Sequence, residues 1–140
     1  MYYPKCISII LLIPQISKIV DIVSKIIYNS SMSKKKELFW VGTSMKDLKD
    51  FPYNARQMAG YQLDRVQGGD EPSDWKPMNT VGAGVKEIRI KDDTGAYRVF
   101  YVAVTAKGVY VLHAFKKKTQ ATELKDIRLA KRRYKEVTGG

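Results

Sequence analysis

The chain has 140 residues, 44% of them hydrophobic and 28% charged, which fits one globular domain and excludes a wholly disordered protein. A single cysteine and a single histidine exclude an intramolecular disulfide framework, a cysteine-rich zinc site and a multi-histidine metal site. We therefore expect no metal or organic cofactor. The 25 lysines and arginines outnumber the 14 acidic residues, and the net charge of +11 favours a polyanionic partner: RNA, DNA or an anionic membrane surface.

The basic excess is concentrated in the last part of the chain. Residues 85–140 carry fourteen basic and six acidic side chains, a net charge of +8. Residues 1–31 and 32–84 carry net charges of only +2 and +1. We expect any surface that binds a polyanion to be built from the C-terminal part.

The first 31 residues differ in composition from the rest. An apolar run from Ile7 to Ile13 ends at Pro14, and apolar residues then recur at helical spacing from residue 16 to residue 27. The uncharged stretch is shorter than the roughly 20 residues of a transmembrane helix, and Pro14 interrupts it.

Met32 begins a polar segment that is typical of a domain's start. We predict that residues 1–31 are an apolar N-terminal extension, that Met32 is the natural start, and that residues 32–140 form the functional domain. Two alternatives stay open for the extension: a helix that packs on the domain or a partner, and a membrane or export role.

One strand and two helices are expected first in the domain. Glu37–Val41 predicts a short strand, and Ser44 with Asp47 resembles a capping box at the start of a helix. Pro52 suits the first position of a second helix, which Gly68 and Gly69 end. The expected inner face of that helix is Ala55, Met58, Ala59, Leu63 and Val66. A loop is predicted for residues 70–84.

Three strands and a last helix complete the pattern. Residues 85–91, 97–104 and 109–115 are rich in β-branched and aromatic residues and are separated by short turns that contain glycine. The last strand is nearly all apolar, which favours burial on both faces. The helix predicted over 122–137 has an inner stripe of Leu124, Ile127, Ala130 or Lys131, Tyr134 and Val137. The run Lys131-Arg132-Arg133, with Lys135, is expected on its exposed face. This order predicts an α+β fold: an N-terminal strand and two helices, an antiparallel meander and a C-terminal helix.

The strands carry basic residues that could act on a phosphodiester. Arg89 and Arg98 flank one hairpin, and Lys116, Lys117 and Lys118 follow the last strand, three residues beyond His113. Arginine binds phosphate oxygens bidentately, and a lysine or histidine with a shifted pKa can transfer protons. Each residue also has a structural interpretation. The lysines could form a solvated turn, and the histidine could be buried and serve packing. Arg98 could pair with an acid on a neighbouring strand, and Arg89 could pair with the nearby Glu87.

Two further segments point to a known family. Gly95-Ala96-Tyr97-Arg98-Val99-Phe100-Tyr101 and Leu112-His113-Ala114-Phe115-Lys116-Lys117-Lys118-Thr119-Gln120 resemble the phage-derived HigB-like branch of the RelE/ParE toxin superfamily. So does the stretch from Trp75 to Ile90, and the resemblance covers about residues 34–138. It implies a RelE-like fold and the toxin of a type II toxin–antitoxin pair, an endoribonuclease that cleaves mRNA in the ribosome through the 2′-hydroxyl without a metal.

The resemblance also implies roles for individual residues. Arg98 matches the arginine that contacts the scissile phosphate, and Arg89 a basic residue on the preceding strand. His113 matches the histidine of this branch, and Lys117 completes the expected catalytic set. The residues expected to bind RNA are Lys86, Lys116, Lys118 and Gln120. Tyr134 lies inside the last helix, so the role of the superfamily's C-terminal tyrosine is not carried over to it.

The partners and location follow from the same resemblance. It implies a cognate antitoxin, usually a helix-turn-helix protein, and the ribosome with its mRNA. Operator DNA would be bound only through the antitoxin complex. The resemblance also implies a cytoplasmic location and no contact with a membrane. Two other functions stay open: a ParE-like poison of DNA gyrase, and a non-catalytic nucleic-acid-binding module.

Overall fold

A computed structural model describes residues 16–27, 34–104 and 107–140. The chain divides into two units, Met1–Lys34 and Lys35–Gly140. The apolar run before Pro14 and the predicted start at Met32 lie outside the described residues.

Residues 16–27 of the first unit form a helix, as their spacing predicts. Its large apolar side chains are all exposed, with Ile19, Ile26 and Ile27 each at 60%. Within the described ranges, no helix combines the length and apolarity that crossing a membrane requires.

The second unit is built on a five-stranded sheet in the order β1-β5-β4-β3-β2. Its strands are β1 (Leu38–Trp40), β2 (Trp75–Pro77), β3 (Val85–Asp92), β4 (Gly95–Val104) and β5 (Gly108–Lys117). β1 is parallel to β5, and the other neighbours are antiparallel. The structure confirms the α+β class and the meander, and it is compatible with a RelE-like fold.

The strand β2 lies where the sequence predicted only a loop. It pairs with β3 at the edge of the sheet, with Trp75 opposite Ile88. Three residues are too few to show an alternating pattern, and Pro77 is tolerated because an edge strand needs no hydrogen bonds on its outer side.

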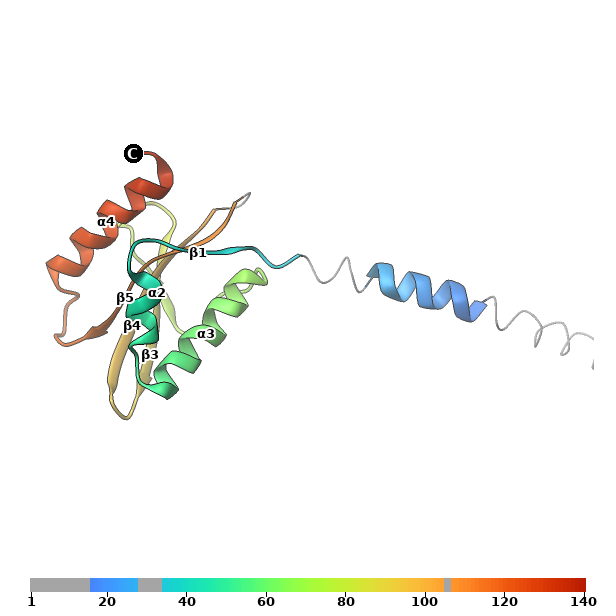
Figure 1. Cartoon of the computed structure of the whole chain (residues 1–140), viewed down its shortest axis with the longest axis horizontal. Coiled ribbons are helices and arrows are strands. Elements are labelled where there is room, and N and C mark those ends of the chain that lie inside the picture. Colours follow the sequence, from blue (N-terminus) through green and yellow to red (C-terminus); the bar gives the residue numbers. More distant parts are fainter. Residues whose placement is uncertain (1–15, 28–33, 105–106) are drawn as a thin grey trace, which may run out of the picture. The chain divides into compact units, whose positions relative to one another are not determined.

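Helices cover both faces of the sheet (Figure 1). The helices α2 (Ser44–Lys49) and α3 (Tyr53–Gln67) pack on one face, and α4 (Leu124–Thr138) packs on the other. The first core contains Leu63, Ile88 and Val99, and the second contains Phe100, Leu112 and Ala130. Both cores include residues of β5, which confirms that this strand is buried on both faces.

Three details of the first two helices differ from the predictions. Thr43, not Ser44, is the N-cap of α2, and its hydroxyl donates to Asp47 Oδ2 at 2.7 Å. Ser44 is fully buried and donates to Val111 O at 3.0 Å, which ties the helix to β5. Pro52 is the N-cap of α3 rather than its first residue, and Met58 is 41% exposed because it lies at the margin of the apolar face.

The helix α4 also departs from its predicted faces. Leu124 is 66% exposed because it begins the helix beyond the edge of the core. Arg133, expected at the surface, is only 7% exposed. Its guanidinium donates to Leu112 O at 2.8 Å and to Thr43 Oγ1 at 2.8 Å, so its burial is compensated by hydrogen bonds. Tyr134 packs as predicted, with its ring against Gly82.

Candidate functional site

The side chains on the α4 face of the sheet form rows across β3, β4 and β5. Side chains on one face of a strand recur at every second residue, so the strand register defines each row. From the β3–β4 turn inward, the rows are Lys91, Ala96 and Lys117, then Arg89, Arg98 and Phe115, then Glu87, Phe100 and His113. The face therefore changes from a basic, partly exposed surface at the turn to a buried row of Glu87, Phe100 and His113.

Ala96 lies at the centre of the basic end. A hollow of about 220 Å³ opens there, lined by Asp74, Arg89, Ile90, Lys91, Ala96 and Arg98. The small alanine side chain leaves this space between the longer cations. Lys91 was not among the predicted site residues, although the short turn from Asp92 to Gly95 sets it opposite Ala96.

Arg98 is held in a fixed position within this cluster. Its side chain is 12% exposed, and Nη1 donates to Tyr97 O at 3.0 Å. Its Nε lies 3.2 Å from Oε1 of Glu87, which is fully buried. Neither carboxylate oxygen of Glu87 has a hydrogen-bond partner within the described chain. The interpretation of Arg98 as the partner of an acid on a neighbouring strand is confirmed.

Glu87, the expected partner of Arg89, instead lies against Arg98 and is itself part of the site. Its alternation on β3 also holds Arg89 and Lys91, whereas Ile88 and Ile90 lie on the other face, so the sequence pattern alone gave no signal of its burial. Burying a carboxylate is unfavourable unless a cation lies close. Arg98 supplies that cation, and Lys76 Nζ lies 3.7 Å away on the other side.

Arg89 pairs with Asp74 rather than with Glu87. The closest approach is 2.6 Å between Nη2 and Oδ1, and Nε donates to the same oxygen at 2.8 Å. The backbone N–H of Arg89 also donates to Asp74 O at 2.9 Å. Both side chains are partly exposed, at 42% and 58%, so the pair forms the open rim of the hollow.

His113 lies on the same face but beneath α4. Its Nε2 is 2.7 Å from Oδ1 of Asp126, and its ring stacks on Phe115 with centroids 4.9 Å apart. Burial lowers the pKa of His113, and the bond to Asp126 opposes that shift. The neutral imidazole joins the first turn of α4 to β5.

The residues predicted to bind RNA are not gathered at the hollow. Lys86 and Lys116 point to the opposite face of the sheet, where Lys86 Nζ lies 2.6 Å from Glu71 and 4.4 Å from the centroid of the Trp75 ring. Lys118 and Gln120 are exposed in the segment between β5 and α4. The structure thus brings Arg89 and Arg98 together at the hollow and places Lys117 on the same face, opposite Ala96 in the strand register.

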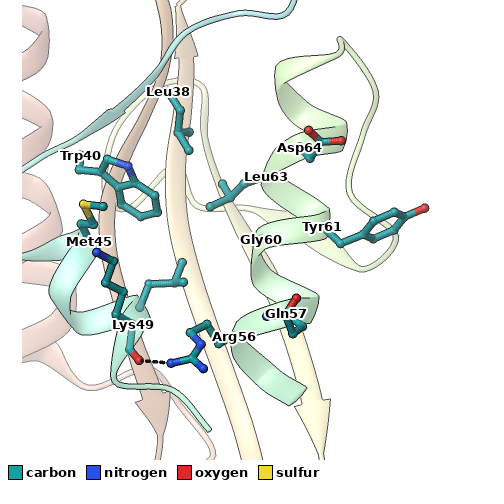
Figure 2. Close-up of a pocket in the computed structure, with 11 residues that line it drawn as sticks. Leu38, Trp40, Met45, Lys49, Arg56, Gln57, Gly60, Tyr61, Leu63 and Asp64 are labelled. Carbon is teal, nitrogen blue, oxygen red and sulfur yellow. Dashed lines mark hydrogen bonds between the residues drawn. The ribbon is translucent and has the colours of Figure 1, made fainter. Parts of the chain in front are cut away.

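A second hollow lies on the other face, between β1, α2 and α3 (Figure 2). Its volume is about 480 Å³, and Leu38, Trp40 and Leu63 contribute apolar side chains to it. At one end Arg56 donates to Lys49 O at 3.2 Å. Its apolar lining suits carbon groups rather than phosphate, and none of the residues predicted to act on RNA borders it.

A comparison with models of protein families shows to which family the chain is related. Residues 46–135 match the model of the phage-derived Gp49-like proteins (DUF891). The chain belongs to this family. Proteins of the Gp49-like family are often toxin-like, which confirms the phage-derived, toxin-like character at that coarse level. The match runs from α2 to α4 and includes the whole basic cluster. No curated protein matches the sequence.

Proposed function

We propose that this Gp49-like protein is the toxin of a type II toxin–antitoxin pair and cleaves mRNA on the ribosome. The observation that carries the proposal is the set of four cations around Ala96: Arg89, Lys91, Arg98 and Lys117. A phosphodiester is the group that such a cluster binds best, because its charge and its oxygens match the arginine donors. The toxin-like character of the family agrees with this choice.

The two arginines bind the scissile phosphate in this mechanism. Tyr97 O holds one terminal nitrogen of Arg98, and Nε faces Glu87, which leaves Nη2 for a phosphate oxygen. Because the guanidinium is fixed before RNA arrives, little side-chain entropy is lost on binding. Arg89 stabilises the charge that develops on the phosphorane oxygens.

Cleavage also needs two proton transfers. The 2′-oxygen attacks phosphorus, the bond to the 5′-oxygen breaks, and the products are a 2′,3′-cyclic phosphate and a free 5′-hydroxyl. In this mechanism Asp74, a partly exposed carboxylate of the hollow, accepts the proton of the 2′-hydroxyl. Lys117 donates a proton to the leaving 5′-oxygen. His113 keeps the anchoring role that its bond to Asp126 supports.

The proposed partners are those that a toxin of this kind requires. They are a cognate antitoxin of the helix-turn-helix type, the ribosome with its mRNA, and operator DNA through the antitoxin complex. The proposed site of action is the cytoplasm, where translation takes place.

The test is primer extension on a reporter mRNA after induction of the full chain. We expect growth arrest and new cuts within translated codons, both abolished by an inhibitor of translation initiation. Arg98→Ala and Arg98→Lys should remove the cuts, and Arg98→Lys keeps a cation beside Glu87 in case the alanine variant unfolds. Arg56→Ala removes an arginine from the opposite face and should cut normally.

Other outcomes would contradict the proposal. Growth arrest with a DNA-damage response and intact mRNA would favour a gyrase poison. RNA binding without arrest or cuts would favour a non-catalytic binding module.

A further inference from the structure

The helix α4 presents a stripe of basic side chains on its outward face. The stripe consists of Lys125, Arg128, Lys131, Arg132 and Lys135, all of them exposed. At 100° per residue, these five positions fall within about a third of the helix circumference, opposite the buried Asp126, Ala130 and Arg133. The stripe extends over roughly 15 Å at 1.5 Å per residue.

Most cations of this stripe have no acidic partner among the described residues. Elsewhere six basic residues form ion pairs: Lys35, Lys46, Lys76, Lys86, Arg89 and Arg98. Within the stripe, only Lys125 is paired, with Glu123 at 3.2 Å. In the described part of the chain, the other four have no ion pair.

The spacing of the stripe is unfavourable for an isolated helix. Arg128 and Arg132 are four residues apart, as are Lys131 and Lys135, and like charges at this spacing repel. An anionic ligand laid along the helix would relieve this repulsion. The charge of α4 therefore fits a ligand that carries several regularly spaced negative charges.

We propose that the basic stripe of α4 binds the phosphate backbone of double-helical RNA. The stripe contains no aromatic residue, and Tyr134 is turned to the core, so α4 offers no aromatic ring on which an unpaired base could stack. Double-stranded RNA is recognised mainly through its backbone and shape, which needs no stacking. The choice of RNA over DNA rests on the proposed function, since a ribosome-dependent nuclease meets folded RNA.

Binding of the full chain to a 20-base-pair RNA duplex, followed by fluorescence anisotropy across a salt series, tests this surface. The variant R128Q/R132Q/K135Q removes three stripe cations, and K46Q/K49Q/R56Q removes three cations from α2 and α3 as a matched control. The slope of log K against log salt falls by roughly 0.7–0.9 for each lost phosphate contact. For the stripe variant, we expect the magnitude of this slope to fall by about 2–3 and the affinity to fall at least tenfold. The affinity of the control should fall less than twofold.

Three results would overturn the proposal. Equal losses in the two triple variants would mean that only net charge matters. A loss confined to the single-stranded RNA of the same sequence, with duplex binding intact, would exclude a duplex ligand. Equal binding of a DNA duplex with the same dependence on the stripe would exclude RNA as the specific partner. Circular dichroism establishes that both triple variants remain folded.

The cleavage assay on the same proteins separates this proposal from the proposed function. Stripe-dependent duplex binding by a protein that makes no cuts would uphold the surface and reject the nuclease. Normal cuts together with unchanged duplex binding in the stripe variant would uphold the nuclease and reject the surface.

Discussion

Arg89 and Arg98 lie directly opposite each other on β3 and β4, and each has its own carboxylate. Arg89 binds the exposed Asp74, whereas Arg98 lies against the buried Glu87. Two like charges in facing positions of a sheet would otherwise repel each other. The two acids thus allow both guanidiniums to occupy one small area, and they differ in whether a ligand can reach them.

The buried carboxylate of Glu87 should be required for stability. Glu87→Gln keeps the shape of the side chain but leaves Arg98 mostly buried without its counter-charge. We expect the free energy of unfolding to fall by about 3 kcal/mol, as for other buried pairs that lose one partner. Urea denaturation measures this, with the exposed Glu37→Gln as a control that should stay within about 0.5 kcal/mol of the parent. A change below 1 kcal/mol in Glu87→Gln would contradict the prediction.

Replacing Asp74 by asparagine should strengthen RNA binding and slow catalysis. Asp74→Asn removes a negative charge from the rim of the hollow, so RNA should bind a few-fold more tightly. If Asp74 accepts the 2′-hydroxyl proton, kcat should fall by about 10²–10⁴-fold. Steady-state cleavage on programmed ribosomes separates KM from kcat. Asp93→Asn, an exposed residue of the β3–β4 turn, should leave kcat unchanged, and an unchanged kcat in Asp74→Asn would reject the assignment.

Arg133 and Arg132 provide a matched pair on one helix. Arg133→Ala removes the buried bonds to Leu112 O and Thr43 Oγ1. We expect a loss of about 2–3 kcal/mol, because hydrogen bonds from charged donors contribute more than neutral ones. Arg132→Ala, at an exposed neighbouring position, should change stability by less than about 0.5 kcal/mol. Equal thermal unfolding midpoints for the two variants would show that the buried contacts contribute little.

His113 should make stability depend on pH below neutrality. Burial lowers the pKa of His113 in the folded protein, so the unfolded chain binds its proton more readily. The contribution of His113 to stability is therefore present above the ordinary pKa near 6.5 and is lost as pH falls towards the lower folded value. Urea midpoints should drop between pH 7.5 and pH 5.5, and His113→Gln should flatten that drop. A parent protein that is more stable at pH 5.5 than at pH 7.5 would contradict the prediction.

Much of the fold could be predicted because its strands are long enough to show their pattern. The meander of β3, β4 and β5 follows directly from apolar segments separated by turns. The short β2 has no such pattern, and the parallel pairing of β1 with β5 depends on contacts far apart in the chain. The burial of Arg133 could not be predicted, since a run of basic residues looks the same whether one member turns inward or not.

Only part of the candidate site could be predicted. Arg89 and Arg98 could be placed together because one hairpin connects them. Lys91 and Glu87 required the exact register, which decides the face on which each side chain lies. His113 could not be assigned from the sequence, because its role depends on Asp126 of α4, thirteen residues away.

The parallel pairing of β1 with β5 has a consequence for folding. Leu38 lies opposite Val109, so this contact closes a long loop, whereas the β3–β4 and β4–β5 hairpins close short ones. Loop closure costs more entropy as the loop lengthens, so the hairpins should form first and β1 should join late. Until it does, an apolar edge of β5 stays open to other chains, and slow folding at high concentration should favour aggregation through that edge.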